Sequence, residues 1–398
     1  MFARARARTL ADMHRTRALA PATLAIHAGT PGPQPAGAVV QPIYQSSTFL
    51  YAGQQSYHDV PYIRLNNTPN QSALARTLAA LEGGEAALVS ASGMAAISTT
   101  LLTVLAAGDH LLAQRRLYGG THSLLVHDLP RLGITVDFID PDRPETWAAA
   151  LRSNTRALYS ETLTNPLLRL ADLPAMAAFA RAHGLVSMID NTVATPVHFR
   201  PIEHGFDLVL HSATKYLNGH SDIVAGAVVG SAALVEQVRQ RQNHLGGALD
   251  PHACFLLQRG LKTLTLRMRQ HSASAIAIAE FLARHPAVAR VNYPGLAQHP
   301  DHARARALLP TGCSGLVSFE LAGGRPAAEA LLARVTLPAV AASLGGAESL
   351  ITIPATTSHA ALSVSEREAA GIAEGLVRLS VGLEDTQDLL DDLALALA

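Results

Sequence analysis

Apolar and polar residues alternate in short blocks along most of this chain, and the block spacing predicts alternating strands and helices. Residues 70–84 carry Leu74, Leu78 and Leu81 on a helical spacing and end in two glycines, as expected of a helix with a glycine stop. We expect further helices over 93–108 and 173–184, and strands over 85–92, 134–140, 156–162, 185–190 and 207–213. This alternation predicts the α/β class, with a mostly parallel sheet covered by helices on both faces.

The two ends of the chain differ from this central block. Residues 1–60 are rich in Pro, Gly, Gln and Ser, which favours an extended N-terminal arm, with residues 1–20 expected to be flexible. Asp250 followed by Pro251 is typical of a helix start, and the helical pattern then continues to Pro286. We therefore expect an arm over 1–60, a large cofactor-binding domain over 61–255 and a smaller α+β domain over 256–398.

Composition narrows the class of protein. The 398 residues are 48% hydrophobic and carry no net charge at pH 7, so neither nucleic acid nor an anionic membrane is an expected partner. No apolar run has the length of a membrane span. Two cysteines cannot form a disulfide framework, so we expect a cytoplasmic protein. The histidines lack metal-ligand spacing, so no metal site is predicted.

The arginines within residues 4–17 indicate a flexible tail or a start codon assigned too far upstream, with a transit peptide as the alternative.

Lysine is scarce in this chain and therefore informative. Of 31 Lys and Arg residues, only Lys215 and Lys262 are lysines. Arginine supplies charge equally well but cannot lose its proton, whereas lysine can act as a nucleophilic amine and form a Schiff base. Lys262 lies in a basic stretch that is typical of a solvated helix face. Lys215 directly follows the strand pattern of residues 206–214, and the carboxyl end of a buried strand is where α/β proteins bind ligands.

An acid and an aromatic ring accompany this lysine. Asp190 ends the preceding strand pattern, one crossover unit upstream of the lysine. Tyr118 stands before Gly119 and Gly120, where its ring can lie flat over a planar ligand. An acid at a strand end often only caps a turn, and a single tyrosine often only packs in a core. The interpretation therefore depends on the order and spacing of all these features together.

Small and hydroxyl residues at two strand ends favour a phosphate group. Ser92, Gly93 and Met94 stand where a strand turns into a helix, and the backbone N–H groups of such a turn attract anions. Ser212 and Thr214 add hydroxyl groups beside the lysine. An amine, a carboxylate, a phosphate cradle and an aromatic platform together indicate pyridoxal 5'-phosphate. In this interpretation the lysine forms an imine with the cofactor's aldehyde, and the acid keeps the pyridine nitrogen protonated.

A set of motifs carries a resemblance to known enzymes: GAVVQPIYQSSTF, YIRLNNTPN, LEGGEAALVSASGMAA, LYGGTH, ETLTNPLL, MIDNTVATP, HSATKYLNGHSD, RGLKTL, SLGGAESL and GLVRLSVGLED. Over about residues 24–390 the chain resembles the Cys/Met metabolism, or trans-sulfuration, family of pyridoxal-phosphate enzymes. The resemblance implies the aspartate-aminotransferase-like fold, known as fold type I. It also implies a sulfur amino acid substrate and a homotetramer built from two tight dimers, with each active site shared across a dimer interface.

The resemblance implies roles for individual residues. Lys215 would be the Schiff-base lysine and Asp190 the partner of the pyridine nitrogen, and Tyr118 would stack on the cofactor ring. The phosphate would be bound by Gly93, Met94, Ser212 and Thr214, together with Tyr62 and Arg64 of a neighbouring subunit. The substrate carboxylate would be bound by Arg378, Ser343 and Asn165. Glu161 and His220 lie in family motifs but receive no chemical role.

The family includes several reactions that share their first steps. β-Elimination, γ-elimination and γ-replacement all begin with removal of the Cα proton to give a quinonoid, so the catalytic residues do not separate them. We expect a C–S lyase that eliminates from cystathionine-like substrates. The alternative is a γ-replacing transferase, either a cystathionine γ-synthase or an O-acylhomoserine sulfhydrylase.

Departures from subfamily patterns guide this choice. Methionine γ-lyase is less favoured, because such lyases typically have cysteine where this chain has Gly120. Ala342 stands where many γ-synthases and γ-lyases have glutamate, and Leu344 stands where bacterial β-lyases have tryptophan. A non-enzymatic protein on this fold would not need Lys215 and Asp190 together.

Overall fold

The computed structural model of this protein describes residues 19–30, 32–360 and 362–398. Its larger sheet has seven strands in the order β1-β7-β6-β5-β4-β2-β3. Strands β6, β5, β4, β2 and β3 run parallel, whereas β7 is antiparallel to both β1 and β6. The strands are β1 (Ala86–Ser90), β2 (His110–Gln114), β3 (Thr135–Ile139), β4 (Thr155–Glu161), β5 (Val186–Asp190), β6 (Leu208–Ser212) and β7 (Gly226–Gly230). The predicted α/β class with a mostly parallel sheet is therefore confirmed.

Two strands of this sheet, β2 and β7, are absent from the sequence prediction. All five residues of each strand are buried. A strand that is buried on both faces has no apolar–polar alternation, and five residues are too few for length alone to identify it.

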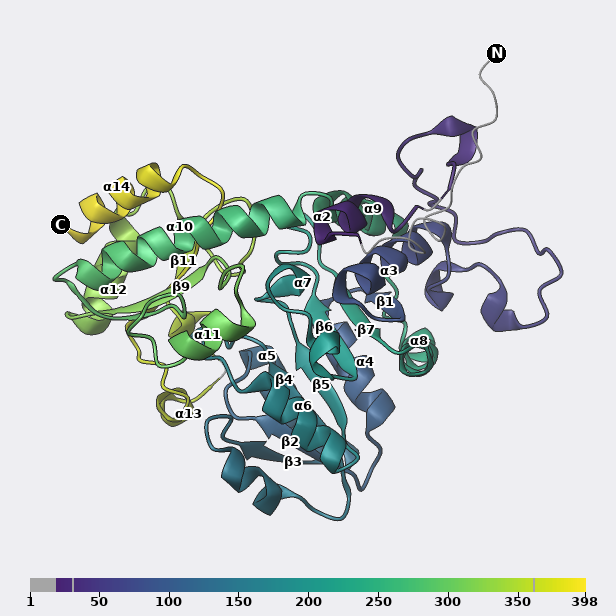
Figure 1. The fold of residues 1–398 in the computed structure, drawn as a ribbon, viewed down its shortest axis with the longest axis horizontal. Helices are drawn as coiled ribbons and strands as arrows, with labels where there is room; N and C mark the ends of the chain where they lie inside the picture. The colour runs from purple at the N-terminus through teal and green to yellow at the C-terminus, as the bar shows by residue number, and fades with distance from the viewer. Residues whose placement is uncertain (1–18, 31, 361) are drawn as a thin grey trace.

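Helices cover both faces of the seven-stranded sheet (Figure 1). Alternate residues of one strand enter different cores, because successive side chains point to opposite faces. Met188 of β5 packs in the core that includes α4 (Gly93–Val104) and α8 (Ala232–Leu245). Its neighbour Ile189 packs in the core that includes α3 (Pro69–Glu82) and α6 (Leu173–Ala182). The short helices α5 (Gly119–Ser123) and α7 (Thr195–His198) follow strand ends.

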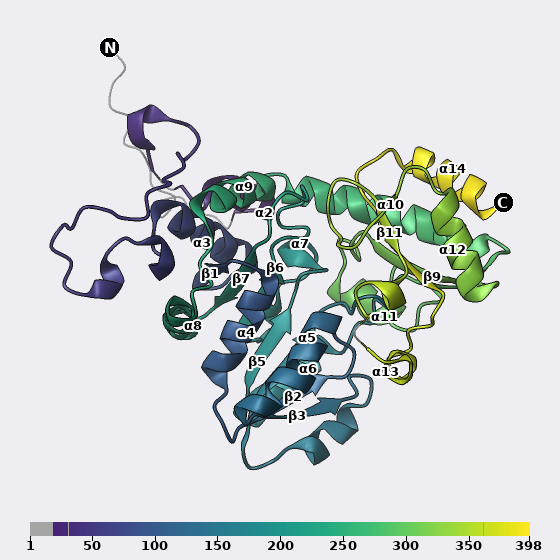
Figure 2. The same ribbon diagram turned by 180° about the vertical axis from the view of Figure 1, so that it is seen from behind.

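The C-terminal part contains a second, five-stranded sheet in the order β10-β11-β12-β9-β8. Its strands are β8 (Val288–Asn292), β9 (Leu316–Leu321), β10 (Ala339–Val340), β11 (Leu350–Thr352) and β12 (Leu376–Ser380). Figure 2 shows this part from behind, beside the larger sheet. Its helices are α11 (His302–Leu308), α12 (Gly324–Arg334), α13 (Val364–Ala369) and α14 (Thr386–Leu397). This separate smaller sheet matches the expected fold type I. The predicted domain bounds stay a prediction.

The long helix predicted from Asp250 to Pro286 is two helices, α9 (Pro251–Leu261) and α10 (Leu264–Arg284). Its start is as expected, because the side chain of Asp250 accepts hydrogen bonds from the N–H groups of residues 252 and 253. At the break, Arg267 donates to the carbonyl oxygens of Gly260 (2.8 Å) and Tyr216 (2.6 Å). The break therefore connects these helices to the loop that carries Lys215.

The N-terminal segment is only partly extended. Helix α2 (Pro21–His27) packs against α3, and the chain over 32–60 then projects away from the body (Figures 1 and 2). Large apolar side chains are exposed on this projection, among them Val39 (95%), Leu50 (93%) and Tyr51 (69%). The expected flexible segment falls mostly on residues 1–18, which lie outside the described residues. In the part of the chain that the structure describes, no helix is both long and apolar enough to cross a membrane.

Candidate active site

A cavity of about 590 Å³ lies at the carboxyl ends of the parallel strands, where the larger sheet meets the C-terminal part. Strands β4, β5 and β6 end at Glu161, Asp190 and Ser212, and each of these residues lines the cavity. Parallel strands bring their carboxyl ends to one edge of a sheet, which is where ligands bind in such folds. Of the twelve predicted site residues, ten line this cavity: Gly93, Met94, Tyr118, Asn165, Asp190, Ser212, Thr214, Lys215, Ser343 and Arg378.

Lys215 lies in the turn that follows β6, and its amino group reaches into this cavity. Its Nζ donates a hydrogen bond to Oγ of Ser343 at 2.7 Å. Burial lowers the pKa of Lys215 to about 8, and the nearby charge of Arg378 adds to this effect. A lysine with such a pKa is readily deprotonated, as a nucleophilic amine must be. Lys262 lies at the end of α9 and does not line this cavity.

Two carboxyl groups lie side by side at the strand ends that line this cavity. Asp190 and Glu161 are paired in register on β5 and β4. Burial raises the pKa of both groups, and for Glu161 the neighbouring charge of Asp190 raises it further. Hydrogen bonds from Thr192 oppose this effect on Asp190, including one from the Thr192 backbone to Oδ1 at 2.9 Å. Glu161 also accepts hydrogen bonds, yet its pKa is raised more strongly, so the anionic form is more favoured for Asp190 than for Glu161.

The start of α4 forms a concave backbone surface beside Ser212. Gly93 is the first residue of α4, and Ser92 caps the helix by accepting from the backbone of Ala95 at 3.0 Å. A Cβ atom on Gly93 would lie 2.7 Å from Cβ of Ser212, so only glycine fits here. Bare N–H groups at the start of a helix bind phosphate. The Thr214 hydroxyl already bonds both backbone groups of Ala225, so it contributes less freely than expected.

Tyr118 stands just before the short helix α5 and is 38% exposed toward the cavity. Its ring lies against Gly120, where an added Cβ atom would come within 2.6 Å of Cε1 of the tyrosine. Its backbone N–H donates to Oε1 of Glu161 at 2.6 Å. The ring is therefore available as a platform on one side of the cavity.

Arg378 of β12 is the cation of the C-terminal part that enters this cavity. It is only 3% exposed, and burial lowers its pKa to about 10. It remains charged at neutral pH. Its Nη1 donates to Oδ1 of Asn165 at 3.1 Å, and its Nη2 donates to the carbonyl oxygen of Ser343 at 2.7 Å. Its Nε is buried without a hydrogen-bond partner among the described residues, so it can bind a carboxylate.

Tyr62 and Arg64 do not reach this cavity in the same chain. The guanidinium of Arg64 lies 5.5 Å from the centre of the Tyr62 ring. It donates hydrogen bonds to the Asn243 carbonyl oxygen and to the Tyr57 hydroxyl, both at 3.0 Å. Tyr62 and Arg64 thus lie next to each other but apart from the ten predicted residues that line the cavity.

The structure adds lining residues that the sequence analysis did not single out. Thr192 follows Asp190 by two positions, so a strand-end rule that included the next turn would have found it. Thr357 and Ser358 come from a segment that shows no periodic pattern, and no sequence signal indicates them. The remaining additions are Ile97, Leu163, Val193 and Val224. Ser92, Glu161, Ala342 and Leu344, which the sequence analysis named without giving their side chains a role in the site, also line the cavity.

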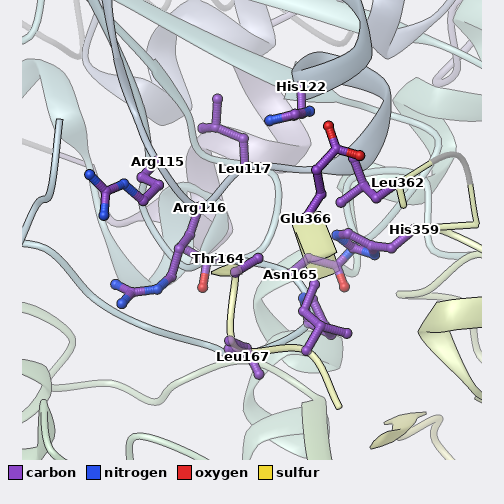
Figure 3. A pocket seen from close by; sticks show the side chains of 13 residues that line it. Arg115, Arg116, Leu117, His122, Thr164, Asn165, Leu167, His359, Leu362 and Glu366 are labelled. Carbon is purple, nitrogen blue, oxygen red and sulfur yellow. The ribbon is translucent and has the colours of Figure 1, made fainter. Parts of the chain in front are cut away.

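A second cavity of about 130 Å³ shares Asn165 with the first (Figure 3). Figure 3 shows His122, His359 and Glu366 around it. Both His359 and the adjacent Ser358 belong to the wall between the two cavities, because Ser358 lines the large one and His359 the small one. The smaller cavity contains neither Lys215 nor Asp190.

The residues of the large cavity fit pyridoxal phosphate. Lys215 offers an amine with a lowered pKa, and Asp190 offers an acid at a strand end. Gly93 has no room for a side chain, so its backbone is left bare for a phosphate. The buried and unpartnered Nε of Arg378 is suited to a carboxylate.

Comparisons with known proteins agree with this fit. The family model described as "Cys/Met metabolism PLP-dependent enzyme" matches residues 22–398. The chain is 45% identical to L-methionine gamma-lyase of Pseudomonas putida, over 94% of this chain and 96% of that protein. It is 44% identical to cystathionine gamma-lyase of Bacillus subtilis, over 94% and 98%. It is also 44% identical to cystathionine beta-lyase MetC of Bacillus subtilis, over 91% and 92%. The expected fold type I and the expected cofactor are confirmed, and the chain belongs to the Cys/Met metabolism family of pyridoxal-phosphate-dependent enzymes.

Proposed function

We propose that this protein is a carbon–sulfur lyase whose preferred substrate is a sulfur amino acid with an uncharged group on sulfur, such as methionine. One observation carries this proposal. Apart from Lys215, Asp190, Glu161 and Arg378, no described residue that lines the large cavity is charged. Its other walls are apolar or carry hydroxyl and amide groups. They include Leu163, Val193, Val224, Ala342, Leu344, Thr357 and Ser358.

The proposal follows from the cost of burying charge. The far end of cystathionine carries an ammonium and a carboxylate group, and each needs a partner when it leaves water. The far end of methionine is a methyl thioether, which an apolar wall accommodates. The chain's similarity to several methionine gamma-lyases supports the same choice.

The proposed chemistry depends on Lys215. When bound, the cofactor supplies an electron sink for the carbanion at the substrate's Cα. Lys215 would hold the cofactor, and its Nζ, with a pKa lowered to about 8, would take up the proton at Cα. Methionine lyase activity then gives methanethiol, 2-oxobutyrate and ammonia, with one water consumed.

The other residues bind and orient. Asp190 would stabilise the positive charge of the pyridine nitrogen, and the ring of Tyr118 would pack against the cofactor ring. The phosphate is bound by Gly93, Met94, Ser212 and Thr214. Arg378 binds the substrate's α-carboxylate, and Ser343 and Asn165 fix the guanidinium through their hydrogen bonds to it. Because Arg378 and Lys215 line the same cavity, a substrate bound through its carboxylate would have its Cα within the same cavity as Nζ.

A cystathionine lyase is the second candidate, and the sequence pattern favoured it. The 44% identity to a cystathionine gamma-lyase and to a cystathionine beta-lyase supports it nearly as strongly as the first relative supports methionine. The γ-replacing transferase and the cytoplasmic location stay predictions.

We further propose that the active protein is a homotetramer with active sites shared between subunits. Val39, Leu50 and Tyr51 are exposed on one projecting segment, and several large apolar side chains exposed on one segment favour a contact with another chain. Tyr62 and Arg64 lie outside their own chain's cavity and would complete the phosphate site of a neighbour.

The test is a comparison of substrates on the purified holoenzyme. We expect kcat/KM for methionine to exceed that for cystathionine by about 10-fold or more, the factor expected when a charged end lacks its partners. The products are measured as 2-oxobutyrate and thiol. A preference for cystathionine would overturn the choice of substrate, and pyruvate as the keto acid from cystathionine would identify β-elimination.

A further inference from the structure

Glu161 is a buried carboxyl group that the proposed chemistry does not use. It is the last residue of β4 and is only 4% exposed. Its Oε1 accepts a hydrogen bond from the backbone N–H of Tyr118, with 2.6 Å between the heavy atoms. We infer that Glu161 is a positioning residue for the cofactor, because it fixes the backbone of Tyr118 and thereby the place of the aromatic ring. This inference rests on the proposed cofactor contact of Tyr118.

The surroundings of Tyr118 explain why an anchor is needed. The residue stands in a turn before a helix of five residues, and its backbone is not helical (φ −52°, ψ 135°). Its ring lies on Gly120, whose bare backbone leaves no space for a Cβ atom between them. The ring thus has the glycine on one side and the cavity on the other. The hydrogen bond to Glu161 connects this turn directly to the end of a central strand.

Neighbouring contacts limit how far the turn can move. A Cβ atom on Gly119 would lie 2.3 Å from the carbonyl oxygen of Ser358, so the turn lies close against a segment that also lines the cavity. A shift of Tyr118 toward the cavity would displace the ring from the cofactor. The segment of Ser358, which also lines the cavity, leaves the turn little room to move. The acceptor at Glu161 therefore selects one position of the ring.

The anchor does not need a negative charge. Glu161 lies beside Asp190 in register, and two buried carboxylates that close together oppose each other's ionisation. Burial raises the pKa of the Glu161 carboxyl well above its ordinary range, which favours the neutral form, and a neutral carboxyl oxygen still accepts from Tyr118. The pKa of Asp190 is raised less strongly, so Asp190 is the acid of the pair that would pair with the pyridine nitrogen. A glutamine at position 161 would keep the accepting oxygen without a charge.

The experiment compares Glu161→Leu with Glu161→Gln by equilibrium binding of pyridoxal phosphate to the apoprotein and by visible circular dichroism. Leucine removes the acceptor, and we expect the dissociation constant to rise about 10-fold, as when a buried donor loses its partner. The dichroic band per bound cofactor should also shrink, because the ring above the cofactor is no longer fixed. Glutamine should keep both quantities within about 3-fold of the wild type. Glu329→Leu on the surface of α12 is the control and should change neither.

A double-mutant cycle tests whether Glu161 acts through Tyr118. In a Tyr118→Leu background, Glu161→Leu should weaken binding by less than about 2-fold, because the two changes are coupled. A full effect of Glu161→Leu in that background would overturn the inference. So would a loss in Glu161→Gln as large as in Glu161→Leu, or wild-type binding and dichroism in Glu161→Leu.

Two controls keep the result interpretable. Thermal unfolding of each apoprotein shows whether the variants fold, and Glu161→Asp, which withdraws the acceptor by one methylene, replaces Glu161→Leu if leucine prevents folding. The readouts need no turnover, so the outcome is separate from the proposed lyase activity. A wild type that binds the cofactor on Lys215 but cleaves no sulfur amino acid would overturn the proposed function alone.

Discussion

Nζ of Lys215 lies 2.7 Å from Oγ of Ser343, although the two residues are 128 positions apart in the chain. Ser343 has a left-handed backbone, with φ of 85°, and its carbonyl oxygen accepts from Arg378. One residue in an unfavourable conformation therefore touches both cationic groups of the cavity. This contact joins the strand ends of the larger sheet to the C-terminal part.

The backbone of Ser343 predicts opposite effects of two small substitutions. A left-handed conformation costs a residue with a Cβ atom about 1 kcal/mol, and glycine does not have this cost. We expect Ser343→Gly to be about 1 kcal/mol more stable than Ser343→Ala, although both lose the hydroxyl group. The free energy of unfolding of the apoproteins in urea measures the difference. Equal stability of the two variants would show that Ser343 is not strained.

The lowered pKa of Lys215 predicts how apoprotein stability depends on pH. The pKa falls from 10.5 to about 8 on folding, so between these values the unfolded chain binds a proton that the folded chain does not. Stability therefore rises with pH across this window. Relative to Lys215→Met, the wild type should gain up to about 3 kcal/mol between pH 8 and 10.5. Lys262→Met is the control, and an unchanging difference between wild type and Lys215→Met would contradict the assigned shift.

A buried pair behind the site predicts a large loss of stability. Nε2 of His211 lies 2.6 Å from Oε1 of Glu82, and the two side chains are 0% and 1% exposed. Removing one member leaves the other buried without its partner, so Glu82→Ala should lower the free energy of unfolding by about 3–5 kcal/mol. Glu329, whose pair with Arg325 is exposed, is the matched control. Glu329→Ala should change stability by less than about 1 kcal/mol. Similar losses in both variants would show that burial does not set the cost.

The separation of Arg64 from its own cavity predicts complementation between subunits. Arg64→Ala and Lys215→Ala should each be nearly inactive, because each lacks a different part of every site. In a mixed dimer one site has both defects and the other is intact. Random pairing should therefore restore about a quarter of wild-type activity, if the dimer is symmetric. Native mass spectrometry verifies that mixed species form. Mixed dimers that regain no activity would place the function of Arg64 within its own chain or remove it.

Much of the site follows from local features of the sequence. Lys215 and Asp190 end apolar strand patterns, and parallel strands place their carboxyl ends at one edge of a sheet, so the two were expected to meet. Gly93 and Met94 stand at a strand-to-helix turn for the same reason. Such features depend on residues close together in the chain, and their periodicity is visible in the sequence alone.

Other features depend on contacts between distant segments, which no local pattern encodes. Strand β7 is buried on both faces and runs antiparallel, so neither alternation nor topology indicated it. Next to the break after Leu261, Arg267 donates hydrogen bonds to Tyr216 and Leu217 in the loop of Lys215 and to Gly260 of α9. Glu161 reaches Tyr118 across 43 residues, and Ser343 reaches Lys215 across 128. The sequence therefore indicates which side chains could take part in the site. Whether they come within hydrogen-bond distance depends on how the two sheets pack, and only the tertiary structure decides that.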